Sequence, residues 1–234
     1  MNGPALLALQ RIDSEIEQIE ARRKRLPERA RLADATAAHT AHSDQRASLE
    51  ATAQEAIATI ERSEAAGAEL DRKKARLEAQ LKTIIAPREA EALMSQIATI
   101  DGQHSDLDDS ELEAMEQQSQ AESALAELAA LEPPLLDALA AARADLDAAL
   151  ATLAEEEASA RARRIEAESA LDESDRQLYA SAVSHHRGVG FATLERHTCT
   201  ACHVDLSQAE YEQVIAAPKT DLPECPHCAR YLVV

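Results

Sequence analysis

The chain has 234 residues with one Phe, three Tyr and no Trp, which argues against a large compact core built on buried aromatic rings. It has no run of 18 apolar residues and no basic stretch typical of a signal peptide at its start, so we expect a cytoplasmic protein without a membrane partner. The net charge of −19 is uneven: residues 1–84 carry 14 basic and 14 acidic side chains, residues 85–179 carry 6 and 23, and residues 180–234 carry 4 and 6. The acidic excess therefore lies on the second of two long segments that are rich in helix-forming residues.

The first long segment, residues 4–84, predicts a helical arm with a heptad-like seam. Seam residues are spaced 3 and 4 apart near both of its ends, with Lys74 filling one position among apolar residues: Leu9, Ile12, Ile16, Ile19, Leu70, Lys74, Leu77, Leu81 and Ile84. Between them we expect a seam of mostly small residues: Ala30, Ala33, Ala37, Leu49, Ala53, Ala56 and Ile60. Pro27 predicts a kink or break near Leu26, because proline lacks the backbone N–H that a helix interior needs.

Residues 85–108 are predicted to form the apex between two arms. Pro87 is placed to open a short helix over residues 88–100, and the polar, turn-rich run 101–106 follows it. A capping box of Ser110 with Glu113 then predicts the start of the second arm, residues 109–184. The sequence Glu132-Pro133-Pro134 predicts a break or kink within this arm.

Two arms of similar length joined by a short apex favour an antiparallel hairpin over a parallel dimer of extended chains. We therefore predict a mainly α fold, with a long antiparallel coiled-coil helical hairpin over residues 1–184. Helical periodicity ends near Ser184, and a hinge rich in histidine and glycine follows. Residues 185–234 are predicted to form a small separate domain.

All four cysteines of the chain lie in this small domain, in two C-x-x-C motifs separated by 22 residues: Cys199, Cys202, Cys225 and Cys228. Two thiolates at i and i+3 can turn towards one tetrahedral ion, and two such turns complete a four-sulfur shell. About fifty residues bury too little surface to fold alone, so one structural Zn²⁺ would supply folding free energy. The spacing predicts a C4 zinc ribbon.

The flanking residues agree with a ribbon. Residues 191–194 predict a strand into the first motif, and residues 231–234 predict a strand out of the second. Between the motifs, Ser207 with Glu210 predicts a capping box at the start of a short helix. Its apolar face would consist of Tyr211, Val214 and Ile215.

Other uses of the cysteines are less favoured. Two disulfides would suit an exported protein, and a thioredoxin-like pair would need a surrounding βαβ pattern. Haem attachment would match Cys199-Thr-Ala-Cys202-His203 but would leave the second motif unexplained. A closed four-cysteine shell has no open position for water, so catalysis by the zinc is not expected. We expect His197, His203 and His227 near the site or at the surface rather than as ligands.

Arginine clusters are the other candidate contacts. The run Arg22, Arg23, Lys24 and Arg25 could touch a partner or a phosphate, although pairing with the acidic second arm is the preferred interpretation. The ribbon region offers only Arg187, Arg196, Lys219 and Arg230 as cations. Phosphate contact needs a cationic surface, and a chain of net charge −19 repels nucleic acid over most of its length.

The sequence resembles a bacterial family with a coiled-coil hairpin and a C-terminal C4-type zinc ribbon. Its most specific motifs are Gly188-Val-Gly190, Cys199-x-x-Cys202-His203 and Cys225-Pro-x-Cys228-x-Arg230. The runs Arg88-Glu89-Ala-Glu91-Ala-Leu93 and Leu112-Glu-Ala-Met115-Glu116 are also similar. The sequence departs slightly from the family pattern before Arg230, where it has Ala229 and the pattern suggests a small residue. The resemblance implies that the four cysteines are zinc ligands. It also implies nucleic-acid binding, or a protein partner from transcription or secretion such as an alternative sigma factor.

No pair of catalytic carboxylates, nucleophile–base set or glycine-rich phosphate loop emerges from the sequence, so we expect no enzyme. The leading hypothesis is a non-enzymatic adaptor or regulatory protein that binds a protein partner through the coiled coil and the structural ribbon. The alternative is a regulator that binds RNA or DNA through the ribbon and the arginine-rich helix patches.

Overall fold

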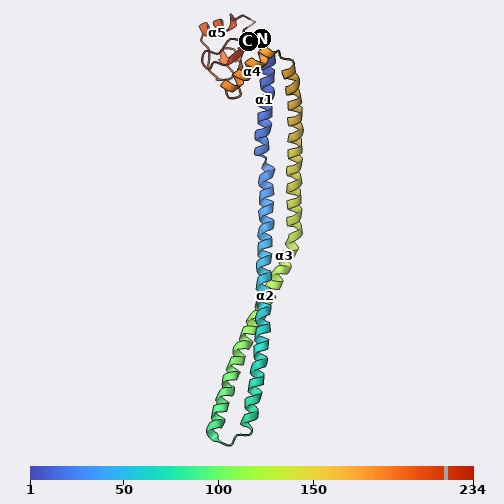
Figure 1. Cartoon of the computed structure of the whole chain (residues 1–234), viewed down its shortest axis with the longest axis vertical. Coiled ribbons are helices and arrows are strands. Elements are labelled where there is room, and N and C mark those ends of the chain that lie inside the picture. The colour runs from blue at the N-terminus through green and yellow to red at the C-terminus, as the bar shows by residue number, and fades with distance from the viewer. Residues whose placement is uncertain (219–220) are drawn as a thin grey trace. The chain divides into compact units, whose positions relative to one another are not determined.

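The computed structural model describes residues 1–218 and 221–234, so Lys219 lies outside the described residues (Figure 1). Long helices dominate the chain, and a small sheet follows them. The elements in chain order are α1 (Gly3–Lys24), α2 (Pro27–Leu81), α3 (Pro87–Ser169), α4 (Glu173–His185), β1 (Phe191–Glu195), β2 (Thr198–Cys199), α5 (Gln208–Ile215) and β3 (Tyr231–Val233). The predicted mainly α class, with long helices followed by a small C-terminal domain, is confirmed. No helix of the described part is both long enough and apolar enough to span a lipid bilayer.

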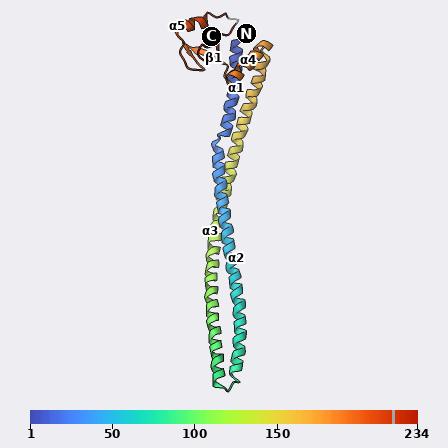
Figure 2. The ribbon, with the colours of Figure 1, turned by 60° about the vertical axis from the view of Figure 1, so that its left-hand side comes forward.

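The chain divides into two compact units, and each is described by itself. The ribbon unit contains residues 1–30 and 143–234, and the apex unit contains residues 31–142. In the apex unit, α2 and α3 lie side by side in both views and are joined by the turn at residues 82–86 (Figures 1 and 2). Their antiparallel direction follows from the ion pairs Arg46–Glu132 and Lys74–Asp101, because the partner number falls as the first number rises.

The seam of α2 in the apex unit follows a continuous heptad pattern. Residues spaced alternately 3 and 4 apart are buried or half-buried, with a single gap at the exposed Arg46: Leu32, Ala35, His39, His42, Leu49, Ala53, Ala56, Ile60, Ser63, Gly67, Leu70, Lys74, Leu77 and Leu81. The predicted alanine seam is right from Leu49 onwards. It is wrong at Ala30, Ala33 and Ala37, which are exposed, because Leu32 and Ala35 occupy the seam positions there.

The apex is shorter than the predicted range of residues 85–108. Helix α2 ends at Leu81, α3 begins at Pro87, and α3 continues without interruption through the polar run 101–106. The reason is a seam with a spacing of seven: Ile100, Leu107, Ala114, Ala121 and Leu128. This seam holds the helix on α2 while all but one of the carboxylates in residues 101–116 are exposed, so the Ser110–Glu113 pair lies inside a helix and caps nothing.

Helix α3 also continues through Pro133 and Pro134, so the chain does not break there. A proline inside a helix removes a backbone donor and leaves the carbonyl four residues earlier without its usual partner. Close to this point the buried His42 of α2 places Nε2 2.9 Å from the carbonyl oxygen of Leu128. Leu128 lies directly before Ala129 and Ala130, whose carbonyl groups lose their donors to the two prolines.

In the ribbon unit, α1 packs on the C-terminal part of α3. Ile16 and Ile19 of α1 form a buried cluster with Leu153 and Ala160 of α3. The predicted break near Leu26 is confirmed, since α1 ends at Lys24 and α2 begins at Pro27. The second arm is not one helix to residue 184: α3 ends at Ser169, and α4 begins after Asp172, whose side chain accepts a hydrogen bond from the backbone N–H of Asp175.

Candidate metal centre

The two C-x-x-C motifs have the same backbone geometry. In the first, Cys199 accepts at its carbonyl from the N–H of His203 at 2.9 Å and donates its own N–H to Val204 at 3.1 Å. In the second, Cys225 accepts from Ala229 at 2.8 Å and donates to Arg230 at 2.8 Å. Each motif is therefore a closed turn that directs the first and fourth side chains to the same side.

Each turn ends in a residue with left-handed backbone conformation. His203, which follows the first motif, has a φ of 56°, and Ala229, which follows the second, has a φ of 55°. Glycine adopts this region without strain, whereas a residue with a Cβ is disfavoured there by about 1–2 kcal/mol. The conformation before Arg230 therefore favours glycine, which has no Cβ, over Ala229.

The four Sγ atoms lie within 4.8 Å of one another, and those of Cys202 and Cys225 are 3.9 Å apart. A tetrahedral Zn²⁺ with Zn–S distances of about 2.3 Å needs sulfur–sulfur separations of about 3.8 Å. The donor set and its spacing therefore fit one zinc ion. Cys199 and Cys225 are buried, so a bound ion would be largely shielded from water.

Protonation of the thiols differs across the site. Burial raises the pKa of Cys225 to about 12, although nearby backbone N–H groups oppose this shift. Burial acts in the same direction on Cys228, but hydrogen bonds from the backbone and the guanidinium of Arg230 outweigh it and lower its pKa to about 7. A bound Zn²⁺ deprotonates its coordinating thiols outright, so all four cysteines would act as thiolates in the metal complex.

A small sheet and one helix support the site. In the sheet, β1 pairs antiparallel with β2 and parallel with β3, which brings the N-terminal strand of the ribbon beside its C-terminal strand. The capping box of Ser207 with Glu210 is confirmed at the start of α5. Val214 of this helix is buried, but Ile215 is half exposed, so the predicted apolar face is narrower than expected. Leu206, Val214 and Leu232 pack with the buried cysteines in one cluster.

The ribbon is fixed to the base of the hairpin by its first strand. The side chain of Gln10 on α1 donates Nε2–H to the carbonyl of Phe191 and accepts the Phe191 N–H, each at 2.7 Å. Gln10 thereby satisfies both backbone groups at the start of β1, much as a neighbouring strand would. Gly190, directly before β1, allows the backbone to lie close to α4, because a Cβ at this position would be 2.6 Å from the Cβ of Ala182.

Aromatic residues continue this junction. The ring of Phe191 stacks with Tyr179 of α4 on one side and Tyr231 of β3 on the other, with centroid distances of 5.7 Å in both pairs. The Tyr179 hydroxyl donates to Asp13 of α1 at 2.6 Å, and burial together with this carboxylate raises the pKa of Tyr179 well above its ordinary value. Three of the chain's four aromatic residues thus join the ribbon to the hairpin.

Sequence reasoning missed Gln10 and Asp13 as junction residues. Both lie between the apolar positions of α1, and Asp13 also accepts from Arg164 of α3 at 2.7 Å. Polar residues between the apolar positions of a helix are ordinary in sequence, so nothing in their spacing marks these two as buried or half-buried. Their partners Phe191, Tyr179 and Arg164 are more than 150 residues away in sequence.

The cationic residues singled out from the sequence have different surroundings. Arg22 and Arg23 pair with Glu156 and Glu157 of α3 at 2.9 and 2.8 Å, as the preferred interpretation expected. Lys24 and Arg25 are exposed at the end of α1. Their contact with a partner or a nucleic acid stays a prediction.

The cations of the ribbon, Arg187, Arg196 and Arg230, have backbone conformations or hydrogen bonds that belong to the fold around the site. Arg187 and Arg196 both have left-handed backbone conformations, with φ of 53° and 59°. Arg230 donates Nε–H to the carbonyl of Val189 at 2.7 Å, so part of its guanidinium serves the fold. Their contact with a partner or a nucleic acid also stays a prediction.

The three histidines lie near the site in separate environments. The ring of His197 stacks on Tyr211 with a centroid distance of 4.2 Å, and Nε2 of His227 lies 3.7 Å from a carboxylate oxygen of Glu210. His203 occupies the turn position described above. The cluster with metal-binding geometry in the described residues contains only the four cysteines.

Comparison with known families and structures agrees with this geometry. A family model described as CT398-like coiled coil hairpin domain matches residues 9–187, and one described as C4-type zinc ribbon domain matches residues 198–232. The second match covers all four cysteines.

Similar proteins are found over the whole length. An uncharacterized protein of Mycobacterium tuberculosis, MT2288, is 29% identical, with 98% of this chain and 94% of the relative covered. Two solved structures share the fold. A protein from Mycobacterium smegmatis gives a TM-score of 0.80 at 24% identity, covering 99% of this chain and 96% of the other. CT398 from Chlamydia trachomatis gives 0.81 at 19% identity, covering 98% and 95%.

Proposed function

The chain belongs to the CT398-like coiled-coil hairpin family and carries a C4-type zinc ribbon, and on this basis we propose that it is a non-enzymatic adaptor that binds a protein partner. In this proposal the zinc has a structural role and the helices provide the binding surface. The adaptor would act in a reducing compartment such as the cytoplasm, where thiols remain available for zinc.

The observation that carries the proposal is the closed metal site. Four thiolates complete a tetrahedral shell, and catalytic zinc needs an open position for water or substrate. The ribbon is also tied to α1 and α4 through Gln10 and Phe191, which suits a structural base. Zinc would then stabilise the fold that presents the helices.

The helices offer exposed apolar side chains for a partner. Large apolar residues on α3 that are 45–67% exposed include Met94, Leu112, Met115, Leu131, Leu136 and Ile165. Single exposed apolar residues are common on protein surfaces, so these residues support protein binding without identifying the contact.

Affinity capture from the native cell with the full chain tests the proposal. We expect a protein partner that survives nuclease treatment and is absent from a capture with an unrelated coiled coil. Removing residues 185–234 would expose Leu6, Leu9 and Tyr179, so Cys225→Ser is the better variant to ask whether the partner contacts the ribbon. Recovery of no protein, or of material that disappears on nuclease treatment, would contradict the adaptor function.

A further inference from the structure

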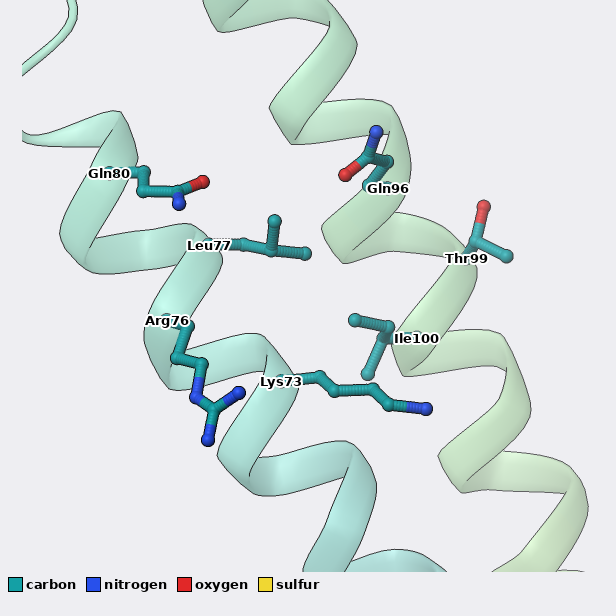
Figure 3. Close-up of a pocket in the computed structure, with 7 residues that line it drawn as sticks. All are labelled: Lys73, Arg76, Leu77, Gln80, Gln96, Thr99 and Ile100. Carbon is teal, nitrogen blue, oxygen red and sulfur yellow. The ribbon is translucent and has the colours of Figure 1, made fainter.

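The end of the apex unit near its turn contains an open groove between α2 and α3. We call it the apex groove; its volume is about 480 Å³ and it is lined by Lys73, Arg76, Leu77, Gln80, Gln96, Thr99 and Ile100. Figure 3 shows that Leu77 and Ile100 point towards each other from the two helices, and that Lys73 reaches across towards α3. The groove therefore has an apolar floor and a rim of cations, amides and a hydroxyl.

The apex groove is cationic in a chain that is strongly acidic overall. Residues 72–88 contain six basic side chains and one acidic side chain, a net charge of +5, whereas the whole chain carries −19. None of the residues lining the groove is acidic. This local reversal of charge is the first indication of what the groove binds.

Most of these cations have no anionic partner within the chain. Lys74 pairs with Asp101 at 2.5 Å, and Arg72 lies 4.0 Å from Glu69. Among the described residues, no ion pair is formed by any of the other four: Lys73, Arg76, Lys82 and Arg88. By contrast, Arg22 and Arg23 at the other end of the first arm are each neutralised by a glutamate.

Apolar side chains are exposed beside the groove. Ile85 in the turn is 97% exposed, and Met94 on the first turns of α3 is 59% exposed. Residues 82–86 are too few to bury an isoleucine, so Ile85 is available to a partner without a change in the fold.

We propose that the apex groove docks an acidic amphipathic segment of a partner protein, with carboxylates on Lys73 and Arg76 and apolar side chains on Leu77 and Ile85, above the largely buried Ile100. The inference rests on the proposed adaptor function and names the surface and the chemistry of its partner. A helix laid in a groove presents apolar anchors at spacings of 3 and 4, and its flanking charges select the partner.

Nucleic acid fits this surface less well. No aromatic side chain lines the groove, so bases have no platform for stacking. Directly after Ile100, residues 101–116 of α3 carry seven acidic side chains and no basic one. A polyanion longer than the groove would meet these carboxylates, whereas a short acidic segment would not.

A second copy of the chain is also less suitable. Its acidic run on α3 has Leu112 and Met115 exposed, so it combines the negative charge and the apolar side chains that the groove would bind. At about 100° per residue, however, Leu112 lies about 160° around the helix from Gln96, which lines the groove. Two copies related by a two-fold axis could not bury both grooves with these faces.

The test uses the full chain and a library of displayed helical peptides of about 16 residues. We expect the selected peptides to combine Asp or Glu with Leu, Ile or Met at helical spacing. Their binding, measured by fluorescence anisotropy, should weaken by about tenfold or more in the double variant Lys73→Glu/Arg76→Glu and as salt rises. Both residues are exposed and form no ion pair within the described part of the chain, so the helical content and melting temperature should be unchanged.

The matched control is Arg31→Glu/Arg143→Glu, which changes net charge equally by reversing two exposed cations outside the groove that form no ion pair with any residue the structure describes. It should bind the peptides as the original chain does, whereas Ile85→Asp should weaken binding without disturbing the helices. Selection of basic or purely apolar peptides, or equal binding by the Lys73→Glu/Arg76→Glu variant, would overturn the proposal. So would tight binding of a uridine RNA of about 20 nucleotides that depends on the same two residues, or a dimer that dissociates on their replacement.

Failure here is distinguishable from failure of the adaptor function. If the partner captured from cells still binds Lys73→Glu/Arg76→Glu, the apex groove is not the docking site and the adaptor function stands. If the original chain captures no partner, the adaptor function itself fails.

Discussion

Replacing Gln10 by Ala should detach the first strand of the ribbon from the hairpin. The side chain is 6% exposed and makes two hydrogen bonds of 2.7 Å to the backbone of Phe191, which is 1% exposed. Without it, a buried N–H and a buried carbonyl lose their partner. Each unsatisfied group costs about 1–3 kcal/mol, and water entering the vacated space recovers part of this, so we expect a loss of about 2–4 kcal/mol.

Hydrogen exchange at the Phe191 amide measures this loss directly. A change of 2–4 kcal/mol corresponds to exchange that is about 30-fold to about 700-fold faster. Gln18→Ala is the matched control, because Gln18 lies on the same helix but is exposed, and its effect should be within about 0.5 kcal/mol. If the exchange rate of the Phe191 amide rises less than about threefold in Gln10→Ala, or rises equally in both variants, the Gln10 side chain does not hold β1.

Four further outcomes follow from the same structure. Metal analysis should find one zinc per chain, and Cys225→Ser should abolish it and make the ribbon protease-sensitive while far-UV helicity barely changes; retained zinc would contradict the four-thiolate site. Ala229→Gly should relieve about 1 kcal/mol of backbone strain and slow zinc release to a chelator, whereas faster release would contradict the left-handed conformation. The pKa of Asp172 is lowered from its ordinary 3.8, chiefly because its carboxylate accepts the backbone N–H of Asp175. The ionised carboxylate therefore stabilises the folded chain above pH 3.8, and this stabilisation is lost as the pH falls through the lowered pKa. Asp172→Asn should therefore keep the cap and remove this acid sensitivity, as judged by helicity between pH 5 and about 2. Replacing both Pro133 and Pro134 by Ala should raise the melting temperature, since each proline inside a helix costs about 3 kcal/mol; an unchanged temperature would mean that neighbouring contacts already offset the cost.

The apex shows where local sequence signals fail. Asp101, Gly102 and Asp106 suggest a turn, and Ser110 with Glu113 suggests a helix start, yet α3 passes through all of them. The deciding signal is the seven-residue spacing from Ile100 to Leu128, which is present in the sequence but weaker than the local composition. Contact of this seam with α2 outweighs local turn propensity, because a long helix gains most of its stability from the face that it packs.

The sequence by itself determined the zinc site and the class of fold. Ligand spacing within a C-x-x-C turn is a local property of a few residues, and a heptad seam repeats often enough to be recognised despite errors in phase. Only the tertiary structure decided how the ribbon is held. Gln10 forms hydrogen bonds with Phe191, and Asp13 accepts one from Tyr179, although the partners are more than 150 residues apart in sequence. No local pattern around either residue predicts its partner. The apex groove was likewise decided in three dimensions, because its floor needs Leu77 and Ile100 from two helices that the turn brings together. The heptad periodicity is a property of one continuous segment and can be read from its sequence. The ribbon junction and the apex groove depend on which distant segments become neighbours in the folded chain.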